Sequence, residues 1–173
     1  MEITTIGLDL AKNFFQIHGI DAAGRVIVRK ALRRSQMLPF FSRLSPCLVG
    51  MEACGTSHYW ARELMKLGHE VTLIPPSYVK AYVKRQKNDV ADAEAIVEAA
   101  LRPTMRFVAV KTEDQQARAM LFRTRQMFVG QRTQLINALR GHLAEHGLVA
   151  ATGTAQLKRL ADAIEDNDTC PLY

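Results

Sequence analysis

Four acidic residues, far apart along the chain, have the types and positions needed for metal-assisted chemistry. Asp9 and Glu52 each end an apolar run, and Asp89 and Asp92 open a predicted helix. A carboxylate at the end of a buried apolar run destabilises the folded state unless a cation lies next to it. Carboxylates bind Mg²⁺, and two such ions roughly 3.5–4 Å apart clamp the attacking and leaving oxygens of a phosphate. The four acids are therefore predicted to be the catalytic and metal-binding residues of a Mg²⁺ or Mn²⁺ site for phosphodiester chemistry.

Each acid also has a purely structural interpretation. Asp9 would only terminate a strand, and Glu52 would be a loop acid or part of a helix cap. Asp89 and Asp92 lie three residues apart in a first helical turn, where the helix dipole favours negative charge. Taken alone, that pair is typical of helix-start acids. Only the conjunction of all four acids favours the metal site.

Basic residues accompany the acids and are predicted to contact the phosphates of a nucleic acid. They are Lys12, Lys80, Lys84, Arg85 and Lys87. The net charge of +6 and the pI of about 9.5 also favour an acidic partner, nucleic acid above all. A run of charges is more often a solvated face, and that alternative stays open for each of these residues.

The elements that must position these residues follow an α/β pattern. An antiparallel meander of three strands is followed by alternating strands and helices, which is typical of a mixed sheet flanked by helices. The predicted strands cover residues 3–9, 13–20, 25–29, 47–51 and 69–74, and the predicted helices cover 35–44, 57–67, 77–86 and 89–101. Asp9 and Glu52 would lie side by side if the first and fourth strands are neighbours.

A long helical arm is predicted after this sheet. From about Thr112 to His146 there is no proline, and apolar residues recur at intervals of seven, such as Leu121, Phe128 and Leu135. The segment is one helix, or a hairpin broken near Gly130. It forms a coiled coil that joins subunits or domains, or it packs on its own domain. The predicted domains are residues 1–110, a helical arm over 111–148 and a flexible acidic tail over 149–173.

The cysteines and the hydropathy of the sequence predict where in the cell the protein is found. There are three cysteines without paired metal spacing, no signal peptide and no apolar run of membrane length. These features predict a cytoplasmic protein that contacts no membrane. Cys47 and Cys54 are expected to pack as small apolar residues.

Three motifs together resemble a known family. Gly7-Leu8-Asp9-Leu10-Ala11-Lys12, Gly50-Met51-Glu52-Ala53 and Lys87-Asn88-Asp89-Val90-Ala91-Asp92-Ala93 are similar to the N-terminal half of the DEDD transposases of bacterial insertion sequences, which include the Piv/MooV invertases. The resemblance covers roughly residues 3–148. It implies an RNase H-like fold similar to Holliday-junction resolvases, with the acids at 9, 52, 89 and 92 binding Mg²⁺.

The resemblance also implies a function with partners. Such a domain is a DNA transposase or recombinase that cleaves and transfers strands with a metal, and some members use a structured guide RNA. Family members carry a serine in a C-terminal domain for which a chain ending at Tyr173 leaves no room, so complete recombination by this chain alone is not expected.

Two functions of other classes compete with this prediction. An actin-like kinase or ATPase also opens with a strand and Gly-x-Asp, but it needs a Gly-Thr-Thr-like stretch where Ala11-Lys12-Asn13 stands. A non-catalytic module would bind nucleic acid through its basic residues and assemble through the long helix, with its acids idle.

Overall fold

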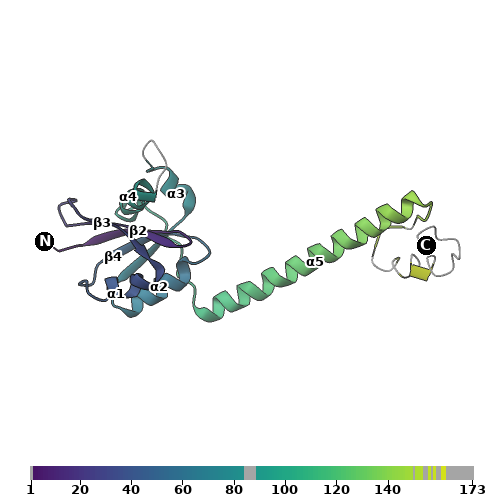
Figure 1. Ribbon diagram of the computed structural model, residues 1–173, viewed down its shortest axis with the longest axis horizontal. Coiled ribbons are helices and arrows are strands. Elements are labelled where there is room, and N and C mark those ends of the chain that lie inside the picture. The colour runs from purple at the N-terminus through teal and green to yellow at the C-terminus, as the bar shows by residue number, and fades with distance from the viewer. Residues whose placement is uncertain are drawn as a thin grey trace. The chain divides into compact units, whose positions relative to one another are not determined.

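A five-stranded mixed sheet is the centre of the N-terminal part of the chain (Figure 1). The computed structural model describes residues 2–83, 89–149, 151–153, 156, 158 and 161–162. The strands are β1 (Thr5–Leu10), β2 (Phe14–Ile20), β3 (Val26–Arg33), β4 (Leu48–Glu52) and β5 (Glu70–Ile74). Their order is β3-β2-β1-β4-β5, in which β1 to β3 form an antiparallel meander and β1, β4 and β5 are parallel. The predicted α/β fold, with an antiparallel meander followed by parallel strands in one mixed sheet, is confirmed, and the first and fourth strands are neighbours.

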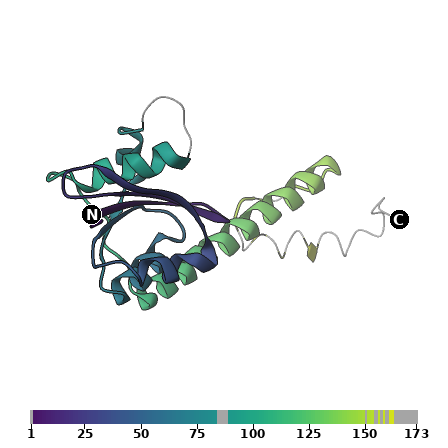
Figure 2. The ribbon, with the colours of Figure 1, turned by 60° about the vertical axis from the view of Figure 1, so that its left-hand side comes forward.

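Helices cover both faces of the sheet (Figure 1 and Figure 2). On one face lie α1 (Met37–Phe41), preceded by the 3₁₀ turn η1 (Arg34–Gln36), and α2 (Ser57–Lys66); on the other lie α3 (Pro76–Lys80) and α4 (Asp89–Ala100). Because neighbouring residues of a strand point to opposite faces, each strand contributes to both layers.

The larger core lies between the sheet and the α1–α2 layer. Ile6 and Leu8 of β1 and Met51 of β4 are fully buried there against residues of both helices. The ring of Phe15 meets the ring of Trp60 edge to face, with the ring centroids 5.1 Å apart. Trp60 thus faces the core, whereas its neighbour Tyr59 is exposed.

Two glycines let α4 lie directly on the opposite face of the sheet. A methyl group at Gly7 would overlap the carbonyl oxygen of Ala93 and lie 2.7 Å from a methyl carbon of Val97. A methyl group at Gly50 would lie 2.9 Å from the Cβ of Ala100. The helix backbone therefore rests on β1 and β4 at positions that no larger residue fits without a shift.

Several local predictions are wrong. The strand β3 extends to Arg33 instead of ending at residue 29, because Leu32 is buried in the core and pairs with Phe15. The predicted helix over 77–86 ends at Lys80 as α3, and the chain turns at residues 81–82, because Val79 alone anchors this helix in the core. Residues 84–86 of that prediction lie outside the described residues.

The two described cysteines differ in their surroundings. Cys47 is buried as predicted, and burial raises the pKa of its thiol to about 11. Its backbone N–H donates to Nδ1 of His69 at 3.2 Å. Cys54, in contrast, is exposed, so the prediction that it packs as a small apolar residue is wrong. Two hydrogen bonds tie its backbone to the hydroxyl of the buried Ser57, and its side chain points away from the core.

The predicted arm is a single helix, α5 (Glu113–Glu145), of 33 residues. It continues through Gly130, so the alternative of a hairpin broken there is wrong. Gly147, with φ of +78°, follows its end. The chain divides into two compact units, Met1–Asp114 and Gln115–Tyr173. Among the described residues, no helix is both long and apolar enough to cross a membrane.

Candidate metal and nucleic-acid site

Asp9 and Glu52 lie beside each other at the carboxyl end of two parallel strands. The last recorded pair between β1 and β4 is Leu8 with Met51, so the same register places the next residues, Asp9 and Glu52, next to each other. Neighbouring strands are about 4.8 Å apart. Both side chains are half-buried. The structure therefore brings together two of the four predicted site residues, although 43 positions separate them in the sequence.

Both acids belong to the sheet face that α4 covers. Side chains alternate along a strand, so Asp9 shares the face of Gly7, and Glu52 shares the face of Gly50. Those two glycines face Ala93 and Ala100 of the helix. The pair thus lies at the carboxyl ends of the strands, on the face of the sheet that α4 covers. Ligands of open α/β sheets bind at the carboxyl ends of the strands.

The other two acids lie at the N-terminus of α4. Asp92 is half-buried and directly precedes Ala93, whose carbonyl oxygen meets Gly7. Asp89 is the first residue of the helix, and its side chain lies outside the described part of the structure. The spacing of three puts both on one side of the helix. The start of the helix is therefore near β1.

The donor set fits a hard cation in type. Half-buried carboxylates are the ligands that Mg²⁺ takes, usually one or two at a time with several waters. Within the described residues, no three His, Cys, Asp or Glu side chains are close enough to hold one ion together. A site here would consist of Asp9 and Glu52 with a contribution from the start of α4, and the four-acid site stays a prediction.

Two of the five predicted phosphate contacts are described, and both follow strand ends at the same edge of the sheet. Lys12 is exposed in the turn after β1, and Lys80 is exposed at the end of α3, which follows β5. Lys84, Arg85 and Lys87 lie outside the described residues. The described lysines thus follow β1, which carries Asp9, and β5, which pairs with the strand of Glu52.

A family model described as a transposase, of the DEDD type found in IS110 elements, matches residues 6–147. That range includes all four acids and all of α5. The chain belongs to this transposase family. The predicted resemblance to DEDD transposases is therefore confirmed.

Curated relatives agree with the family match. The chain is 51% identical over 173 residues to a "Probable family 20 transposase" of Pseudomonas aeruginosa, covering 99% of this chain and 51% of that protein. It is 43% identical over 169 residues to the "Transposase for insertion sequence element IS1328" of Yersinia enterocolitica, covering 98% of this chain and 51% of that protein. The chain thus spans about half the length of the curated relatives it matches.

Solved structures of RuvC from Thermus thermophilus are also similar. One, in complex with a Holliday junction substrate, has a TM-score of 0.46 and 14% identity, covering 62% of this chain and 100% of that one. A second RuvC structure has a TM-score of 0.45 and 13% identity, covering 60% of this chain and 99% of that one.

One polar neighbour of the acid pair could not be predicted from the sequence of this transposase-family chain. Gln16 of β2 pairs directly with Asp9, so it shares the face and the level of the acids, and its side chain is half-buried. Gln16 precedes a buried Ile17 in an alternating strand, and no sequence signal distinguishes it from any polar strand residue. Only the antiparallel register places it there.

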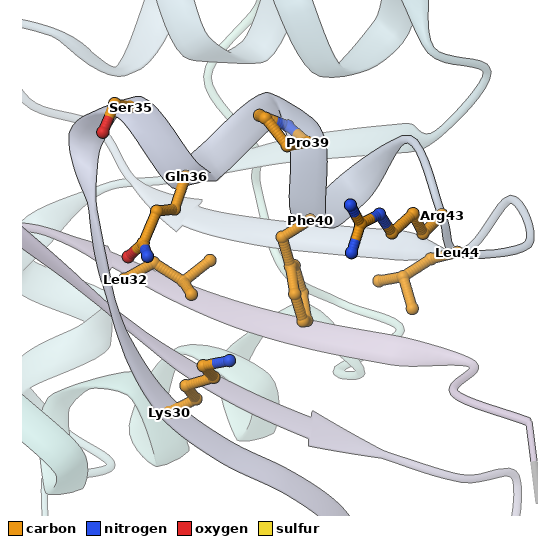
Figure 3. A pocket seen from close by; sticks show the side chains of 8 residues that line it. All are labelled: Lys30, Leu32, Ser35, Gln36, Pro39, Phe40, Arg43 and Leu44. Carbon is orange, nitrogen blue, oxygen red and sulfur yellow. The ribbon is translucent and has the colours of Figure 1, made fainter.

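The face opposite the acids carries a separate pocket of about 410 Å³ (Figure 3). Leu32, Phe40 and Leu44 form its apolar lining between β3 and α1, with Lys30 and Arg43 at its sides. Leu32 belongs to the core on the α1–α2 side. This pocket is therefore not part of the candidate metal site.

Proposed function

We propose that this chain is the catalytic domain of a DNA transposase or recombinase, in which Asp9, Glu52, Asp89 and Asp92 hold Mg²⁺ or Mn²⁺ for phosphodiester cleavage and strand transfer. The observation that carries the proposal is the side-by-side placement of Asp9 and Glu52 at one sheet edge. The family match supports it, and so does the order of the four acids, which is the order that the label DEDD spells.

The residues have distinct roles in this proposal. A bound metal ion would polarise the scissile phosphate and activate a water or hydroxyl nucleophile. Asp9 and Glu52 would hold the ion from rigid strands, and the acids of α4 would close the site from the helix layer. Lys12 and Lys80, with Lys84, Arg85 and Lys87, would bind the DNA backbone and carry no base specificity.

The proposal also covers the requirements of strand transfer, the substrate, the cellular location and a further partner. The chain covers about half of its relatives, so we infer that strand transfer needs the part of those proteins that it does not match. DNA is the proposed substrate, in the cytoplasm, and a structured guide RNA is a further proposed partner.

Cleavage of DNA by the purified chain tests this proposal. We expect nicking of branched or supercoiled DNA in Mg²⁺ or Mn²⁺, none in EDTA, and strong inhibition when Ca²⁺ replaces Mg²⁺, because Ca²⁺ takes more ligands at longer distances. Gel electrophoresis of end-labelled strands would measure it. Metal-independent DNA binding without any cleavage would instead support the non-catalytic module.

That second candidate function has one observation in its favour. Lys12 and Lys80 are exposed, and so are Leu121, Phe128 and Leu135 of α5, which are the basic and apolar surfaces that such a module would use. Such a module would still use the basic residues and α5.

Oligomerisation through α5 is proposed for either function. Leu121, Phe128 and Leu135 lie at intervals of seven and are all exposed, which is the pattern of a helix that packs on another helix. From residue 115 to 144 the sequence has five arginines and no acid, so two copies would repel electrostatically. Association through this apolar stripe should therefore tighten as salt screens that repulsion.

Replacing Leu135 with glutamate should weaken self-association by about tenfold or more, because a charge enters the apolar stripe. Sedimentation equilibrium at low and high salt would measure the dissociation constant. Gln134→Glu is the matched control, since it adds the same charge to an exposed position next to the stripe. A chain that is monomeric at every accessible concentration would contradict the proposal.

A further inference from the structure

An aromatic and cationic pocket of about 300 Å³ lies between α3 and the segment that follows α4. Tyr78 and Tyr82 line it from one side, and Arg102, Thr104 and Arg106 line it from the other. Ligand pockets commonly begin at about this volume. The pocket has no part in the metal site described above.

The pocket lies on the same sheet face and at the same sheet edge as the acid pair. Ile74, the last residue of β5, pairs with Glu52, and α3 starts two residues later. Tyr82 packs against the apolar cluster of Ile74 and α4 residues on that face. One strand spacing, about 4.8 Å, separates Glu52 from Ile74. A strand of nucleic acid held at the acids would therefore reach the pocket by continuing past β5.

One arginine of the pocket is already held in a stacking position. The guanidinium carbon of Arg102 lies 5.5 Å from the ring centroid of Tyr82, and its Nη2 donates to Glu98 at 2.7 Å. This arrangement fixes a flat cation with further N–H donors at the pocket wall. Lys80, Arg102 and Arg106 bring three positive charges to this neighbourhood, where Glu98 pairs with Arg102.

The tyrosines supply surfaces for a flat ligand. Tyr78 is 41% exposed at the pocket although α3 contributes a buried Val79 to the core. Exposed aromatic rings next to arginines are the combination that binds single-stranded nucleic acid, because bases stack on the rings and phosphates meet the cations. An uncharged peptide or a small apolar ligand would gain nothing from these positive charges.

We propose that this pocket binds an unstacked base of single-stranded DNA next to the scissile phosphate, with Tyr78 and Tyr82 as the stacking platform and Arg102 and Arg106 as the phosphate contacts. The proposal rests on the proposed DNA function but not on the metal. It assigns a positioning role to residues outside the four acids and the predicted basic cluster.

Binding of a fluorescently labelled single-stranded oligonucleotide, measured by anisotropy in EDTA, tests it. Tyr78→Ala and Arg106→Ala should each weaken binding by about tenfold, as loss of one stacked base does. Tyr59→Ala and Arg43→Ala are the matched controls, since both residues are exposed and lie outside the pocket, and they should change the affinity less than twofold. Circular dichroism would verify that each variant is folded.

Photocrosslinking assigns the location independently. An oligonucleotide with 5-iodouracil should crosslink to Tyr78 or Tyr82, as found by mass spectrometry of the tryptic peptides. Equal affinity of the pocket and control variants, or crosslinks confined to other segments, would overturn the proposal. A more than tenfold preference for RNA of the same sequence would overturn the assignment to DNA. Because EDTA is present throughout, loss of metal-dependent cleavage would leave this result unaffected.

Discussion

Replacing Asp9 with asparagine is expected to weaken Mg²⁺ and Mn²⁺ binding by at least about 100-fold and to abolish metal-dependent cleavage. The amide has the shape of the carboxylate but carries no charge, so the ion loses one of its hard anionic ligands while the strand is kept. Even changes to residues behind the ligands cost 10–100-fold in metal affinity, so loss of a ligand should cost no less. Calorimetry with Mn²⁺ measures the binding directly.

The double variant Asp9→Asn with Glu52→Gln should bind metal no more weakly than either single variant. The register places both acids next to each other, so they would hold the same ion and act as a unit. Groups that act together give strongly non-additive effects. Additive losses from the two substitutions would indicate that the acids bind separate ions or none.

Glu70→Gln is the matched control for these variants. Glu70 is an exposed acid at the opposite end of β5, so its replacement raises the net charge of the chain by one, as Asp9→Asn does, without touching the acid pair. Its metal binding should equal that of the wild type. Equal binding curves for wild type and Asp9→Asn would contradict the metal site at this edge of the sheet.

The parts of the site that the sequence predicted are those with a local signal. Asp9 and Glu52 each end an apolar run, and such a run predicts a buried strand wherever it occurs. That these two strands are neighbours has no local signal, because strand pairing depends on the whole topology. The structure supplied that step through the parallel pairing of Leu8 with Met51.

The aromatic pocket had no local signal at all. Tyr78 and Arg106 are 28 positions apart in the sequence, and both look like ordinary surface residues there. They meet because the chain returns to the sheet after α4, where the N–H of Val108 donates to the carbonyl oxygen of Leu73 at 2.7 Å. A single long-range bridge of this kind leaves no periodicity in the sequence. Gln16 had no local signal for another reason, because only the register between β1 and β2 pairs it with Asp9.

Replacing Gly7 with alanine is expected to destabilise the N-terminal unit by about 3 kcal/mol, because overpacking a tight contact with no room to relax costs this much. The added methyl group would overlap the carbonyl oxygen of Ala93, which belongs to the backbone of α4 and cannot rotate away as a side chain does. Thermal unfolding should show a decrease in Tm on the order of 10 °C.

Gly55→Ala is the control for this substitution. Nothing lies within 4 Å of a methyl group at that position, so the same chemical change should alter the stability by less than about 0.5 kcal/mol. An unchanged Tm in Gly7→Ala would mean that α4 can move away from β1 at little cost.

The metal affinity of the Gly7→Ala variant shows whether the acids of α4 bind the ion or whether the start of α4 only packs on the sheet. The added methyl group forces the helix away from β1 next to Asp92, while Asp9 and Glu52 keep their strand positions. If the acids of α4 share the ion, a variant that removes no ligand must still lose affinity at temperatures where it is folded. If affinity persists while stability falls, the ion is held by the strand pair alone, and the start of α4 contributes only packing.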